Sequence, residues 1–217
     1  DAQGDLSDAP ESSLSRRARI LHAMGEDQIA LGHLDRALAY FRAAHRSTSE
    51  MVRRAPTHGD ALFAHAQSEF WIGNTALQRN DIAQTTTYFR RYADTADRLA
   101  ALFPHHALWS KEAGYAANNL GVAALKSDQL DDALVQFQKA VQILGRHSQN
   151  SPKDHRLQME HADSLCWLAD THLLKGQSDK AHEARLTARR IYAGLRAIDP
   201  ANAEYRLFFA RNEMGLA

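Results

Sequence analysis

Apolar and small residues recur along most of the chain at steps of three and four positions, which is the period of an amphipathic helix. Between residues 60 and 78 this stripe consists of Leu62, Ala66, Phe70, Gly73 and Leu77. A polar break at 79–81 follows, in which Asp81 is a candidate N-cap for the next helix. A second stripe runs to Leu102 and ends before Pro104, because proline disfavours helical geometry in the residue before it. The pattern predicts a pair of helices and no strand.

This helix pair is one copy of an internal repeat with a period of 48 residues. Four prolines follow that interval: Pro56, Pro104, Pro152 and Pro200. A column of small residues does the same: Gly25, Gly73, Gly121 and Ala169. Sixteen residues after each of these stand Phe41, Phe89, Phe137 and, breaking the aromatic column, Arg185. We expect repeats at about 14–56, 57–104, 105–152 and 153–200, a partial fifth repeat at 201–217, and a polar linker or disordered lead-in at 1–13.

The order of small residue, alanine, phenylalanine and closing proline in each repeat resembles the tetratricopeptide repeat (TPR) family, whose usual unit has about 34 residues. The extra length divides between the two helices, so that each is about seven residues longer than in the usual unit. Seven residues are close to two helical turns, so the apolar stripe of each helix stays nearly in phase. The repeats look most like the long TPR units of large bacterial signalling proteins. The resemblance implies an all-α, right-handed superhelical solenoid of antiparallel helix pairs, with about nine helices.

Composition and charge narrow the classes of function. The 26 basic and 26 acidic side chains of the 217 residues balance, which argues against electrostatic capture of nucleic acid. No apolar run approaches the ~18–20 residues of a membrane span, so we expect no membrane insertion. Cys166 is the only cysteine and has no partner for an internal disulfide. The single thiol and the lack of a signal-peptide pattern favour the cytoplasm, with the periplasm left open.

The TPR resemblance implies that certain positions on the first helix of each repeat line a concave groove. At these positions we single out Phe70, Trp71, Asn74, Tyr115, Asn118, Asn119, Asp163, Trp167 and Asp170. Aromatic rings suit the side chains of an extended peptide, and amides suit its backbone. The alternative, that these rings fill the core between repeats, stays open. The TPR subtype that clamps a terminal carboxylate needs cations where this chain has Phe70, Asp163 and Trp167, so we exclude it.

Neither the twelve histidines nor the sequence motifs predict a metal site, a cofactor or a catalytic centre. Two metal ligands on one helix lie three or four residues apart, and no two histidines have that spacing. We therefore interpret the histidines as polar surface residues. A Gly-rich phosphate loop, a Gly-x-Ser-x-Gly elbow and a His-Glu-x-x-His pair are all absent from the sequence, so we expect no enzyme.

Two functions remain open. The first is a protein- or peptide-binding scaffold, the recognition or assembly segment of a larger bacterial protein, which predicts an open groove. The second is a ligand or signal-peptide sensor that regulates an attached effector domain, which predicts a closed pocket around Trp71, Tyr115, Asn119 and Trp167. A homodimer through the terminal helices is compatible with either, since residues 201–217 match only the first helix of a repeat.

Overall fold

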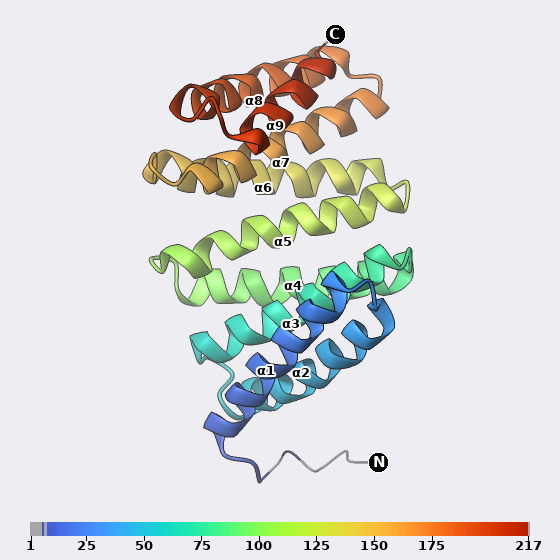
Figure 1. Ribbon diagram of the computed structural model, residues 1–217, viewed down its shortest axis with the longest axis vertical. Helices are drawn as coiled ribbons and strands as arrows, with labels where there is room; N and C mark the ends of the chain where they lie inside the picture. Colours follow the sequence, from blue (N-terminus) through green and yellow to red (C-terminus); the bar gives the residue numbers. More distant parts are fainter. Residues whose placement is uncertain (1–5, 7, 217) are drawn as a thin grey trace. The chain divides into compact units, whose positions relative to one another are not determined.

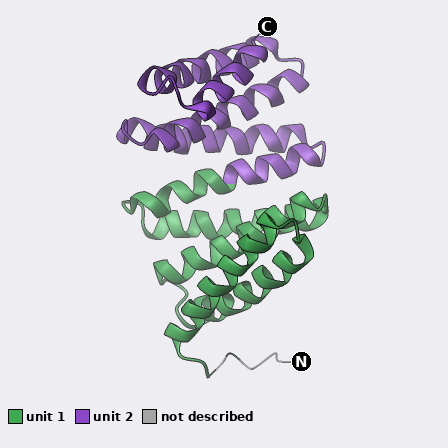
Figure 2. Cartoon of the chain, viewed as in Figure 1, with its two compact units in different colours: residues 1–116 green, residues 117–217 purple. Residues whose placement is uncertain are grey.

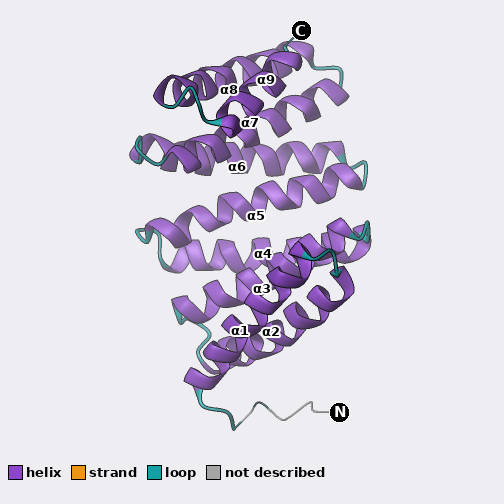
Figure 3. Ribbon diagram, viewed as in Figure 1, coloured by secondary structure: helices purple, strands orange, loops and turns teal. Residues whose placement is uncertain are grey.

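The computed structural model describes residues 6 and 8–216, and this part of the chain holds nine α-helices and no strand (Figure 3). The helices are α1 (Glu11–Ala30), α2 (Leu34–Arg54), α3 (Gly59–Gln78), α4 (Ile82–Leu102), α5 (Ala107–Lys126), α6 (Leu130–Asn150), α7 (His155–Leu174), α8 (Ser178–Ile198) and α9 (Ala203–Met214). The odd-numbered helices begin at residues 11, 59, 107, 155 and 203, which preserves the interval of 48 residues. The all-α prediction is confirmed.

The chain divides into two compact units, unit 1 (Asp1–Ala116) and unit 2 (Ala117–Ala217), with the boundary inside α5 (Figure 2). In unit 1, α1 packs against α2, α2 against α3, and α3 against α4. In unit 2, α6 packs against α7, α7 against α8, and α8 against α9. Consecutive helices within a unit run in opposite directions, which is the sequential antiparallel pairing of a TPR-like helical repeat (Figure 1). None of the described helices is long and apolar enough to cross a membrane.

The loop inside each helix pair contains one residue with left-handed backbone geometry. These residues are Gly32, Asn80, Asp128 and Gly176, with φ of 76, 58, 58 and 71°. Glycine, asparagine and aspartate are the residue types that tolerate this region best. Directly after Asn80, the Asp81 carboxylate accepts a hydrogen bond from the Gln84 amide at 3.0 Å, which confirms Asp81 as the N-cap of α4. The polar breaks are therefore turns with a specific backbone requirement.

The small-residue and phenylalanine columns meet inside three of the helix pairs. The contacts are Gly25 with Phe41, Gly73 with Phe89, and Gly121 with Phe137. A Cβ atom on these glycines would lie 2.4, 2.5 and 2.7 Å from the facing ring, so the buried rings rest directly on bare backbone. In the fourth pair the residue sixteen positions later is Arg185, and Ala169 replaces glycine. The sixteen-residue offset in the sequence is the signature of this contact.

The N-terminal lead-in is more ordered than its polar composition predicts. Helix α1 begins at Glu11, three residues before the expected start, because the Pro10 carbonyl accepts hydrogen bonds from the amides of Ser13 and Leu14. The Arg54 guanidinium donates to the carbonyls of Leu6 and Ala9 at 2.7 and 2.6 Å. The rest of the predicted linker, residues 1–5 and 7, lies outside the described residues.

Candidate functional site

Four of the nine predicted groove residues belong to unit 1, and two of them are aromatic residues of α3 that pack against neighbouring helices. The Trp71 ring stacks on Phe41 of α2, with centroids 5.2 Å apart and an interplanar angle of 7°. The Phe70 ring lies 5.7 Å from Tyr92 of α4. Both rings are half-buried, as are the remaining two residues, Asn74 and Tyr115. In this unit the predicted rings therefore contribute one face to the packing between helices and leave part of their surface to solvent.

The other five residues belong to unit 2. Trp167 of α7 stacks on Phe137 of α6, with centroids 6.0 Å apart and an angle of 7°, and it remains 38% exposed. This contact repeats the stacking of Trp71 on Phe41 at a distance of 96 residues along the chain. Asn119 is half-buried, and Asn118 has a buried Oδ1 atom for which the described part of the chain offers no hydrogen-bond partner. Asp163 and Asp170 lie about one turn from Trp167, on the same helix.

Three of these five residues surround a cavity of about 280 Å³ among α7, α8 and α9. Its lining consists of Asp163, Cys166, Trp167, Asp170, Arg185, Tyr192, Phe208, Arg211, Asn212 and Met214. Sequence reasoning found the residues from α7 and missed those from α8 and α9. A signal was nevertheless present for Arg185, because an arginine interrupts the phenylalanine column at that position.

Hydrogen bonds hold the polar walls of this cavity in place. The Tyr192 hydroxyl donates to Asp163 Oδ1 at 3.1 Å, and the Arg185 guanidinium pairs with the Asp170 carboxylate. Asn212 is fully buried, accepts from the Cys166 thiol at 3.4 Å and donates to the Arg185 carbonyl at 3.2 Å. Asn212 therefore joins α9 to both α7 and α8, which fixes the third side of the cavity.

The ionisation of the cavity follows from burial. Burial raises the pKa of the Asp163 carboxyl, although the hydrogen bond from Tyr192 and the charge of Arg211 oppose the shift. Burial likewise raises the pKa of the Cys166 thiol, so the unreactive thiol form dominates at neutral pH. The cavity thus offers an exposed indole ring beside acidic side chains, and its cysteine is suited to packing.

Three histidines of unit 1 differ from the prediction that the histidines are polar surface residues, whereas the other histidines of this unit are exposed as predicted. His22, His45 and His65 are half-buried, and burial lowers the pKa of each imidazole to about 4. They belong to a polar network in which Ser68 Oγ lies 2.9 Å from His22 Nε2 and accepts from Thr48 Oγ1 at 3.2 Å. The prediction was wrong because it considered spacing along single helices, whereas the network joins residues of α1, α2 and α3.

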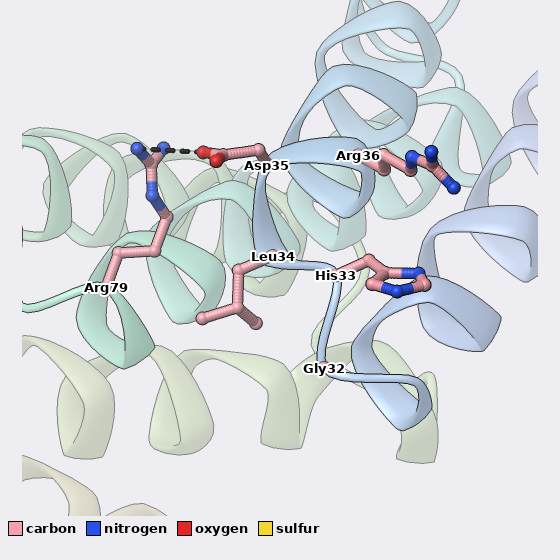
Figure 4. Close-up of a pocket in the computed structure, with 6 residues that line it drawn as sticks. All are labelled: Gly32, His33, Leu34, Asp35, Arg36 and Arg79. Carbon is pink, nitrogen blue, oxygen red and sulfur yellow. Dashed lines mark ion pairs between the residues drawn. The ribbon is translucent and has the colours of Figure 1, made fainter.

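Two further hollows lie in unit 1. One, of about 660 Å³, lies between α1 and α3, and Arg19, His22 and Gln67 are among its lining residues. The other, of about 560 Å³, surrounds the loop before α2, where Asp35 points toward Arg79 and forms an ion pair of 2.9 Å (Figure 4). Because the Asp35 carboxylate is 85% exposed, water screens this pair. No residue predicted for the groove lines the second hollow.

The similarity of this chain to known proteins lies in its fold alone. No protein-family model and no characterised protein matches the sequence. Among solved structures the chain is similar to BtubC (BKLC) from P. vanneervenii, with a TM-score of 0.67 and 18% identity over 82% of this chain and 64% of BtubC. It is also similar to the apo form of RapI, with a TM-score of 0.61 and 14% identity over 91% of this chain and 69% of RapI.

A third neighbour is TTC0263, a thermophilic TPR protein in Thermus thermophilus, at a TM-score of 0.39 and 16% identity over 91% of this chain and 99% of that one. This chain spans less than two thirds of BtubC. The likeness to BtubC and RapI shows a helical-repeat fold of the TPR type.

Proposed function

We propose that this chain is a non-catalytic peptide-binding module that holds an extended or helical segment of another protein. Helical repeats of the TPR type are generally protein-binding scaffolds. The observation that carries the proposal is the unit 2 cavity, where the exposed Trp167 ring lies among Asp163, Asp170 and Arg185. An aromatic ring with nearby charges binds one anchoring side chain and orients the peptide that carries it.

The size of the cavity favours a peptide over a whole small molecule. A volume of about 280 Å³ is just below the roughly 300–1,000 Å³ of small-molecule sites, and it suits one anchoring side chain. The Asp163 carboxyl accepts a hydrogen bond from the neutral Tyr192 hydroxyl and lies near the charge of Arg211, whereas the Asp170 carboxylate is paired directly with Arg185. A lysine or arginine of the peptide fits best, because it interacts with both the Asp163 carboxylate and the Trp167 ring.

The remaining features of the proposal follow from the sequence. We infer that the module is the recognition or assembly segment of a larger bacterial cytoplasmic protein, built from long TPR units. Each unit is also proposed to contact the peptide through its own predicted groove residues, which are Phe70, Trp71, Asn74 and Tyr115 in unit 1 and Asn118 and Asn119 in unit 2. A sensor that regulates an attached effector domain remains the alternative, and a homodimer through the terminal helices is compatible with both functions.

Selection of random displayed peptides on the purified chain tests the proposal directly. We expect enriched peptides with a basic residue beside an apolar one, and we expect Trp167→Ala and Asp163→Asn each to weaken their binding by about tenfold or more. Arg190→Ala is the matched control, because this exposed α8 residue does not line the cavity. Circular dichroism confirms that each variant stays helical. Equal binding by the parent and Trp167→Ala contradicts the proposed site.

A broader comparison uses the triple variant Trp71→Ala/Asn119→Ala/Trp167→Ala. If the peptide also contacts the predicted residues outside the cavity, the triple variant binds more weakly than Trp167→Ala alone. An equal loss in the two variants confines the site to the cavity. Isothermal titration with one selected peptide measures this difference.

A further inference from the structure

We propose that His45, His65 and Glu69 bind one divalent transition-metal ion, of which zinc fits best. His45 lies on α2, whereas His65 and Glu69 lie one turn apart on α3. One ligand atom from each of the three side chains lies within 4.8 Å of the others. The site lies wholly in unit 1 and is independent of the proposed peptide-binding function.

The distance between two of the three ligand atoms already matches that in a zinc centre. His65 Nε2 lies 3.4 Å from Glu69 Oε1. Two ligands at the usual zinc distances of about 2.0–2.1 Å and at a tetrahedral angle are separated by about 3.3–3.4 Å. The His45 ring lies beside the His65 ring, with centroids 4.6 Å apart, and one of its nitrogens lies within 4.8 Å of the ligand atoms of both other residues.

The unsatisfied nitrogen of His45 is the observation that points to a ligand. Its Nε2 atom is buried and has no hydrogen-bond partner among the described residues, which is costly for a polar atom. Its Nδ1 atom faces the Ser49 hydroxyl at 3.4 Å. In the tautomer with the proton on Nδ1, the Nε2 lone pair is available to an ion.

An outer layer of hydroxyl groups orients the other two ligands. Thr48 Oγ1 lies 3.0 Å from His65 Nδ1, which leaves Nε2 of that ring as the ligating atom. The Thr95 hydroxyl of α4 donates to Glu69 Oε2 at 2.7 Å, so Oε1 is left facing His65. Metal sites in proteins commonly hold their histidine and carboxylate ligands by such hydrogen bonds.

The neighbouring charges moderate the affinity of the site for a cation. The Arg91 charge acts on all three ligands and Arg46 on His45, which disfavours a cation, whereas Asp94 near Glu69 favours one.

The donor set selects the ion. Two imidazole nitrogens and one carboxylate oxygen are the three-ligand set of many zinc sites that keep a fourth position for water. Magnesium and calcium prefer sites made of oxygen atoms, so these two ions fit poorly. Helix spacing alone did not reveal the site, because His45 and His65 lie twenty residues apart and meet only where α2 packs on α3.

A zinc titration of the metal-free chain in competition with a chromophoric chelator tests the site. We expect the chain to bind one equivalent of zinc in competition with the chelator, and we expect His45→Asn and His65→Asn each to abolish this binding. Thr95→Val should weaken it by about 10-fold or more through the lost hydrogen bond to Glu69. Arg91→Gln should tighten it, a change that no loss of folding produces.

Three comparisons separate this site from weak binding by the other histidines. His182→Asn, which removes an exposed histidine of α8, should leave the tight equivalent unchanged. Cobalt in place of zinc should give the strong visible absorption of a four-coordinate ion, lost in His45→Asn. Circular dichroism checks the fold of each variant. The absence of a tight equivalent in the parent chain, or its persistence in both His45→Asn and His65→Asn, overturns the proposal.

Discussion

The Phe89 ring lies directly on the backbone of Gly73, so that a Cβ atom at position 73 would come within 2.5 Å of the ring carbon Cδ1. The ring is fully buried and cannot move away without disturbing the pairing of α3 with α4. We predict that Gly73→Ala lowers the free energy of unfolding by about 1–3 kcal/mol, the usual cost of overpacking a core. Urea unfolding followed by circular dichroism measures the change.

Gly194 provides the matched control in another helix. Nothing lies within 4 Å of a Cβ atom placed there, and the residue is exposed on α8. Gly194→Ala should raise the free energy of unfolding by about 0.5–1 kcal/mol, because alanine has less backbone freedom to lose on folding. If both substitutions have the same effect, the Gly73 contact with Phe89 does not constrain the fold.

A smaller side chain at position 89 should relieve the steric clash. We predict that Phe89→Leu destabilises the parent chain but costs less in the Gly73→Ala background, because leucine leaves room for the added methyl group. A double-mutant cycle gives this coupling energy, which should be favourable by about 0.5 kcal/mol or more. Strict additivity would show that the two positions act independently.

The half-buried imidazole of His22 predicts a loss of stability in acid. Burial lowers its pKa from 6.5 to about 4, so the unfolded chain binds a proton between these values that the folded chain excludes. The contribution of His22 is therefore fully present above pH 6.5 and is lost as the pH falls toward 4. The buried His45 and His65 act in the same direction, whereas Glu69, whose pKa is raised to about 7, acts in the opposite one.

Urea unfolding of the parent and of His22→Gln between pH 7 and pH 4.5 measures the contribution of His22. The parent should lose stability on acidification, and the variant should lose less, by at most about 1.4 kcal/mol per pH unit. A variant with the same pH dependence as the parent would show that His22 is protonated in the folded chain.

Glu112 of α5 is buried and accepts two hydrogen bonds within unit 1. The Tyr92 hydroxyl donates to its Oε1 atom at 2.5 Å, and the Gln67 amide donates to the same atom at 2.6 Å. Glu112→Ala leaves the buried Tyr92 hydroxyl without this acceptor, and we predict a loss of about 1–3 kcal/mol in the free energy of unfolding. Glu112→Gln should cost less, because the amide oxygen still accepts. Thermal unfolding of both variants ranks them, and an equal cost would argue against the hydrogen bonds.

Features of the fold that depend on residues close together along the chain could be predicted from the sequence. The extents of α3 and α4, the break between them and the Asp81 cap follow from periodicity and turn chemistry within a few residues of each position, and the structure confirms them. The start of α1, in contrast, lies three residues earlier than expected. The repeated sixteen-residue offset between Gly73 and Phe89 is visible in the sequence, whereas the contact between the two residues is seen in the structure.

Interactions between helices decided the rest. The cavity beside Trp167 needs Arg185 and Asn212 from α8 and α9, and the cluster of His45 with His65 and Glu69 needs the docking of α2 on α3. The sequence by itself determined where each helix lies and which stripe it buries, because those properties depend on neighbours three or four residues away. Only the tertiary structure decided which polar side chains meet, since the rotation and offset of one helix against another bring together residues that are distant along the chain.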